Sequence, residues 1–150
     1  MALLACSTVQ GFKGPEGWMH PVDNDDQRAA GEWLAEHLQP GERIMTRSMV
    51  VEFYAHRTAM IIPAGTNEQV LDYARHYGVT YLVADWYTLH RLHRSMGRVT
   101  HHPENYPGVH IAYVTEQQGR RTVILRLDPT GPADGSTPPM GALLSFTGDS

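Results

Sequence analysis

The chain has 150 residues, of which 41% are hydrophobic and 19% charged, and its formal net charge is −4. These values describe one globular domain that is long enough to bury a core without disulfides or structural metals. The single cysteine, Cys6, excludes an intramolecular disulfide and a cysteine-based zinc framework. The acidic balance, without a clustered excess of lysine and arginine, disfavours nucleic acid as a partner.

The apolar N-terminal run, Met1 to Cys6, is far shorter than the roughly 20 residues that span a bilayer, and it is too short for a secretory signal. Three interpretations fit Leu3-Leu4-Ala5-Cys6. It is the end of a transmembrane helix whose upstream part is missing, a lipobox with Cys6 as the lipidated residue, or a native start with an apolar tail. The first two interpretations place the domain outside the cytoplasm.

Residues 1–24 carry glycine and proline with little periodicity, which predicts an irregular lead-in after a membrane segment. Helical order is expected to begin at Asp25, with Ala30, Trp33, Leu34 and Leu38 on one face, and to end before Pro40. The next predicted elements are a strand over 43–46, a helix over 49–55 with Ser48 as its N-cap, and a buried strand over 58–62.

The second half begins with Thr66 and Gln69, which fit a capping box that opens a helix, and Gly78 suits the end of that helix. Residues 79–84 are almost continuously apolar, which predicts a central parallel strand covered on both faces. A helix is expected over 86–96. Alternating runs over 109–115 and 120–127 predict a hairpin, and 128–150 reads as a flexible Pro/Gly-rich tail.

This order predicts a small three-layer, Rossmann-like α/β domain over residues 25–127, with a mainly parallel sheet that ends in an antiparallel hairpin. Ligands of open α/β sheets bind beyond the carboxyl ends of the strands, so Arg47, Gly65, Thr66 and Asp85 are the candidate ligand-binding residues. Arg47 suits an anionic group, Asp85 a sugar hydroxyl or a cation, and Gly65 with Thr66 offers amides at a helix start. The structural alternative is that Asp85 caps a helix, Arg47 is solvated and Gly65 turns the chain.

Nine histidines make a metal site worth testing. His90 and His93 stand three residues apart on one predicted helix, a spacing at which two imidazoles can share an ion, and the His101-His102 pair follows in the next loop. Arg91 and Arg94 would repel a cation there, so solvated histidines are the alternative interpretation. A histidine-metal hydrolase would carry stoichiometric zinc.

No catalytic constellation is found in the sequence. It has neither glycine-rich phosphate fingerprint, G-x-G-x-x-G or G-x-x-x-x-G-K-[ST], and no G-x-S-x-G nucleophile elbow. Cys6 lies in the lead-in, away from any scaffold. The sequence therefore predicts no catalytic residue and no cofactor.

A family resemblance is carried by the stretch from Asp26 to Arg47, with its Ala30-Gly31-Glu32-Trp33-Leu34 helix leading into a strand, and by three later segments. These segments are Phe53-Tyr54-Ala55-His56-Arg57, Ile61-Ile62-Pro63, and Tyr77-Gly78-Val79-Thr80-Tyr81-Leu82-Val83-Ala84-Asp85. Together they resemble the C-terminal soluble region of bacterial polytopic glycosyltransferases of the GT-C class, which are similar to dolichyl-phosphate-mannose protein mannosyltransferases. The resemblance covers residues 26–85 and extends more loosely to Leu127.

The resemblance implies an accessory domain rather than a catalytic one. In the GT-C class the catalytic acidic residue lies in an extracytoplasmic loop near the first transmembrane helices, and the donor is a lipid-phosphate-linked sugar. These 150 residues do not include that region, so no catalytic residue is carried over, and Asp85 is not promoted to one. The implied location is the extracytoplasmic side of the bacterial membrane. The implied partners are the transmembrane part of the same polypeptide and a lipid-linked sugar or acceptor. The alternative is a free-standing α/β module that binds a small anion or sugar.

Overall fold

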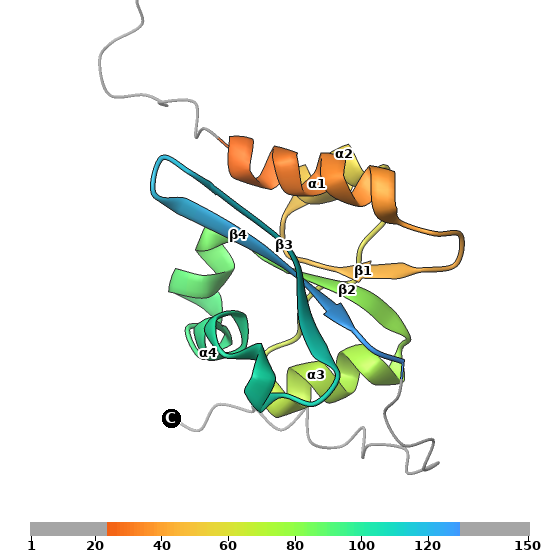
Figure 1. The fold of residues 1–150 in the computed structure, drawn as a ribbon, viewed down its shortest axis with the longest axis vertical. Helices are drawn as coiled ribbons and strands as arrows, with labels where there is room; N and C mark the ends of the chain where they lie inside the picture. Colours follow the sequence, from red (N-terminus) through yellow and green to blue (C-terminus); the bar gives the residue numbers. More distant parts are fainter. Residues whose placement is uncertain (1–23, 130–150) are drawn as a thin grey trace, which may run out of the picture.

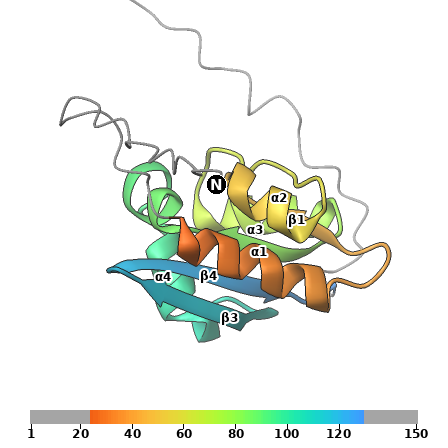
Figure 2. The same ribbon diagram turned by 90° about the horizontal axis from the view of Figure 1, so that it is seen from above.

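The computed structural model describes residues 24–129, so the predicted lead-in and tail lie almost wholly outside the described residues. The elements in chain order are α1 (Asp25–His37), β1 (Arg43–Met45), α2 (Met49–Ala55), α3 (Asn67–His76), β2 (Val79–Ala84), the π-helical turn η1 (Thr88–Leu92), α4 (Met96–His101), the 3-10 turn η2 (Pro103–Asn105), β3 (Val109–Gln117) and β4 (Arg120–Leu127). Helices α1 and α2 cover one face of the sheet, and α3 and α4 cover the other (Figure 1, Figure 2). Within residues 24–129, no helix is both long enough and apolar enough to cross a membrane.

The sheet has four strands in the order β1-β2-β4-β3. Only β1 and β2 pair in parallel, whereas β4 pairs antiparallel with both β2 and β3. The prediction of a mainly parallel, Rossmann-like sheet is therefore not confirmed, although the α/β class is. Strand β2 is central, with β1 on one side and the second strand of the hairpin on the other, and its side chains are buried on both faces of the sheet, which explains its apolar run.

Two other predicted elements change. The strand predicted over 58–62 is reduced to a single parallel bridge between Met60 and Met45, so this segment extends the sheet by one residue only. The helix predicted over 86–96 extends only as far as Leu92, the end of η1, and a turn at His93 to Ser95 follows it. Helix α4 begins at Met96 and occupies part of the stretch that was predicted as a loop. The helical nature of this segment is confirmed, and its continuity is not.

Local signals that depend on neighbouring residues are confirmed. The Thr66 hydroxyl accepts from the Gln69 amide at 3.3 Å, and the Gln69 side chain accepts from the Thr66 amide at 2.9 Å, which completes the capping box. The hairpin turns at Gln118 and Gly119, whose φ angles are 51° and 75°. Two successive positive φ values are those of a type I′ turn, whose twist matches that of the two strands.

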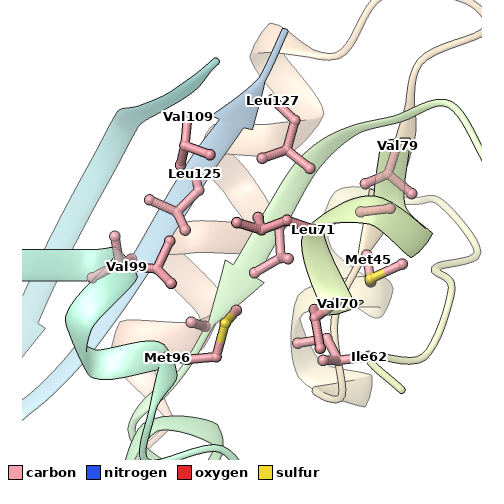
Figure 3. Close-up of a cluster of buried hydrophobic side chains, with 14 of the residues drawn as sticks. Met45, Ile62, Val70, Leu71, Val79, Met96, Val99, Val109, Leu125 and Leu127 are labelled. Atoms are coloured by element: carbon pink, nitrogen blue, oxygen red, sulfur yellow. The ribbon is translucent and has the colours of Figure 1, made fainter. Parts of the chain in front are cut away.

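Two apolar clusters fill the space between the layers. The cluster under α3 and α4 joins Val70, Leu71, Met96 and Val99 to side chains of the sheet such as Leu125 (Figure 3). The second cluster joins α1 and α2 to the opposite face and contains Ala30, Leu34, Ile44, Val51, Ala55, Tyr81, Val83 and Ile124. Each face of the sheet is thus buried by its own helix pair.

Helix α1 is held tightly against its neighbours at two points. A Cβ added at Gly31 would stand 2.7 Å from the Tyr54 Cβ and 2.9 Å from the Val51 carbonyl oxygen, so only glycine permits this approach of α1 to α2. The Thr122 hydroxyl of β4 donates to the Asp26 carboxylate at 2.6 Å, and both residues are buried. Since Asp26 also lies in the first turn of α1, its charge favours the helix start.

Candidate functional site

The carboxyl ends of β1 and β2 lie at one edge of the sheet because these two strands run parallel. Thr46, Arg47 and Ser48 follow β1, and Asp85 follows β2, so two of the predicted ligand-binding residues belong to this edge. Gly65 and Thr66 come after the Met60 bridge, which pairs with β1 in parallel.

The Asp85 carboxylate is used on both oxygens. One oxygen accepts from the Thr88 amide at 3.0 Å, which caps the helical turn that follows β2. The other accepts from the Gln27 side-chain amide of α1 at 2.8 Å. Asp85 is 4% exposed, so little of the carboxylate faces solvent. This arrangement agrees with the structural alternative for Asp85, that of a helix cap.

Gln27 connects this cap to a second one. The Ser48 hydroxyl donates to the Gln27 Oε1 atom at 2.6 Å and accepts from the Val51 amide at 3.2 Å, as the N-cap of α2. The orientation of the Gln27 amide is determined by chemistry, because a carboxylate only accepts and the amide nitrogen must therefore face Asp85. One side chain of α1 thus satisfies the caps of two helices that begin at adjacent strand ends.

Gly65 and Thr66 are also occupied locally. The Thr66 amide donates to the Gln69 side chain, so the capping box uses a donor that an anion at the start of α3 would need. A Cβ added at Gly65 would lie 2.9 Å from the Gln69 Oε1 atom. A side chain at this position would therefore push the Gln69 amide out of the capping box, whether or not a ligand binds.

Among the predicted ligand-binding residues, Arg47 has the charged group that is most accessible to a ligand. Its side chain is exposed, and its Nε atom donates to the Ile62 carbonyl at 3.1 Å, which places the guanidinium over the chain that leads to α3. Close to it lies His93, which is 7% exposed. Burial, and secondly the charge of Arg47, lower the pKa of the His93 imidazole. The lowered pKa favours the neutral form of the His93 imidazole.

The predicted metal pair, His90 and His93, lies in two different environments. His90 is exposed, stacks on Trp86 with 4.7 Å between ring centroids, and has its Nδ1 atom 2.9 Å from the Trp86 carbonyl oxygen. His93 is buried at the end of η1. Between residues 24 and 129, no group of three or more histidine, cysteine, aspartate and glutamate side chains could hold a metal ion.

A surface hollow of about 370 Å³ lies on α2 and the residues after it, lined by Met49, Glu52, Phe53, His56, Arg57 and Thr58. Met49 and Phe53 are 82% and 70% exposed. The Glu52 carboxylate accepts from the Ala59 amide at 2.6 Å, so it helps to fold the loop. Sequence patterning did not identify this hollow, although an i, i+4 pair of apolar residues on the outer face of a short helix was its visible signal.

Comparison of the chain with protein-family models, with curated proteins and with solved structures finds no match. At the strand-end edge, the described polar groups form two helix caps, a capping box and one exposed arginine. Gln27, the residue that joins the two helix caps, was not predicted, because a glutamine in the first turn of a helix has no distinctive pattern.

Proposed function

We propose that the chain is a non-catalytic, extracytoplasmic accessory domain of a polytopic bacterial membrane glycosyltransferase that uses a lipid-phosphate-linked sugar. The observation that carries the non-catalytic part of this proposal is the use of Asp85, Gln27 and Ser48 in helix capping. An enzyme of open α/β type needs free acids, bases or nucleophiles at the strand ends. Here those residue types hold the helices together.

The residues that carry the family resemblance have structural roles that suit a shared fold. Leu34 is fully buried between α1 and the sheet, and Trp33 stacks on Tyr113 with 5.4 Å between ring centroids. Tyr81 is buried on the same face and meets Trp33 edge-on. That these residues are packed supports the proposal of a shared architecture, and the proposed accessory role rests on the family resemblance.

The test is the gene and the membrane protein that it encodes. The reading frame upstream of Met1 should continue into a region of several membrane spans, and the intact protein in membrane vesicles should expose residues 24–129 on the extracytoplasmic side. Sugar transfer should require the membrane region, and the 150-residue chain alone should transfer no sugar. An isolated reading frame without preceding spans would refute the proposal.

A second candidate function, a binding module for a small anion or sugar, is favoured by the exposed guanidinium of Arg47. Titration calorimetry with phosphosugars and nucleotides tests it, with Arg47→Ala as the informative variant. Arg57→Ala is the matched control, because Arg57 is an exposed arginine on the loop after α2. Equal affinity in the wild-type chain and in Arg47→Ala would remove this site.

A further inference from the structure

The charges of the chain are separated along its length. Residues 86–102 contain Arg91, Arg94 and Arg98 and no aspartate or glutamate, although the whole chain has a net charge of −4. The opposite sign dominates residues 25–42, which carry Asp25, Asp26, Glu32, Glu36 and Glu42 against the single Arg28. Helix α1 and the η1–α4 segment lie on opposite faces of the sheet (Figure 1).

The three arginines occupy the outer side of the η1–α4 segment, and this outer side is called the basic face below. Leu89, Met96 and Val99 point into the core cluster, whereas Arg91, Arg94 and Arg98 are all exposed. Among the described residues, none of these three arginines forms an ion pair with a carboxylate. The next acidic residue along the chain, Glu104, lies 3.1 Å from the His102 ring. Within residues 24–129, the basic face is therefore left without an ion pair to a carboxylate.

Aromatic and apolar side chains accompany the arginines. Trp86 stacks on His90, and the Arg94 Nε atom donates to the His90 carbonyl at 3.0 Å. The Arg120 guanidinium, from the start of β4, lies 6.0 Å from the centre of the Trp86 ring. Tyr87 and Leu92 are 53% and 38% exposed in the same segment. Exposed arginine beside tyrosine, tryptophan and leucine is the composition of surfaces that rest at a membrane interface.

We propose that the basic face binds the surface of an anionic phospholipid bilayer, with the arginines on lipid phosphates and Tyr87 and Leu92 at the headgroup level. Exposed Leu92 favours a bilayer over nucleic acid, because base recognition uses aromatic stacking and hydrogen bonds rather than aliphatic contact. No run of adjacent basic residues marks this face in the sequence, because two and three other residues separate its arginines. The inference deepens the proposed function and rests on it for the presence of a bilayer next to the chain.

The test is co-sedimentation of the full 150-residue chain with vesicles of phosphatidylglycerol and phosphatidylcholine in equal parts. At low ionic strength the chain should bind these vesicles and not vesicles of phosphatidylcholine alone, and binding should weaken as salt is added. The variant R91Q/R94Q/R98Q should lose about 100-fold in partitioning, since each arginine near an anionic surface contributes about fivefold.

The matched control is R28Q/R57Q/R126Q, which removes the same charge from exposed arginines outside the basic face. It should stay within about threefold of the wild-type chain. The inference would be overturned if both triple variants lost vesicle binding equally, or if the chain bound neutral and anionic vesicles equally well. It would also be overturned if M49S/F53S lost vesicle binding and R91Q/R94Q/R98Q did not, or if the chain bound a single-stranded oligonucleotide more tightly than the vesicles. Vesicle binding and gene context are separate measurements. A chain that does not bind anionic vesicles contradicts the inference about the basic face but not the proposed function. An isolated gene contradicts the proposed function, and the vesicle experiment then still decides whether the basic face binds anionic lipid.

Discussion

Replacing Asp85 with alanine tests whether its carboxylate stabilises the fold or binds a ligand. The substitution removes the cap on the Thr88 amide, which costs about 1 kcal/mol in helix N-caps. It also removes the acceptor of the Gln27 amide, a charge-assisted hydrogen bond worth about 2 kcal/mol, and leaves that amide half-buried without a partner. The free energy of unfolding should therefore fall by about 3 kcal/mol.

Urea unfolding followed by circular dichroism measures this loss. Asp85→Asn is the matched control, because asparagine caps a helix about as well as aspartate. Its amide group would nevertheless face the Gln27 amide, so we expect a smaller loss of about 1 kcal/mol. In a double-mutant cycle, Gln27→Ala should cost much less in the Asp85→Ala background than in the wild-type chain. A loss below about 1 kcal/mol for Asp85→Ala would show that the carboxylate does not hold the helices and would return it to the ligand-binding hypothesis.

Three further predictions concern packing, a buried hydrogen bond and pH. Gly31→Ala should lower the free energy of unfolding by about 1–2 kcal/mol, although alanine has the better helix propensity, because the added Cβ meets α2. Gly97→Ala in α4 should raise it slightly, because an added Cβ there meets nothing within 4 Å. Urea midpoints in the reverse order would contradict the close α1–α2 contact. Thr122→Val should cost about 2 kcal/mol, because the buried Asp26 carboxylate loses its donor, and a midpoint equal to that of the wild-type chain would refute this role. Burial first, and a neighbouring guanidinium second, lower the pKa of His93 in the folded state. Below the unfolded value of about 6.5 the unfolded chain binds more protons, so stability should fall as pH decreases towards the folded pKa, and His93→Gln should flatten the dependence of Tm on pH in that window.

The parts of the fold that were predictable are those determined by residues close in sequence. Hydrogen bonds and φ angles within a few residues determine the capping box at Thr66, the cap at Ser48 and the hairpin turn that ends at Gly119. The position of β4 beside β2 depends on the whole tertiary structure, since Leu82 pairs with Leu125. A continuous apolar run indicates a strand covered on both faces, but it carries no information on the direction of its neighbours.

The candidate site shows the same division. The location of Arg47 and Asp85 at one edge follows from the parallel pairing of β1 and β2. The sequence predicted a mainly parallel sheet but not which strands pair. The partners of Asp85 were not predictable, because Gln27 lies 58 residues away and reaches it only through the packing of α1. Helices that begin at adjacent strand ends need polar caps, so this edge is rich in polar residues whether or not a ligand binds there. What distinguishes the two cases is whether the polar atoms already have partners.

Net charge is a weak guide to the partners of this chain for a related reason. The value of −4 sums charges that lie on opposite faces of the sheet, with acidic residues on α1 and arginines on the η1–α4 segment. At physiological ionic strength the Debye length is about 8 Å, so an approaching surface senses mainly the face that it meets. Two variants of equal net charge, one altered on the basic face and one elsewhere, should therefore differ in binding to anionic vesicles. If they bind alike, total charge governs the interaction and the basic face has no separate role.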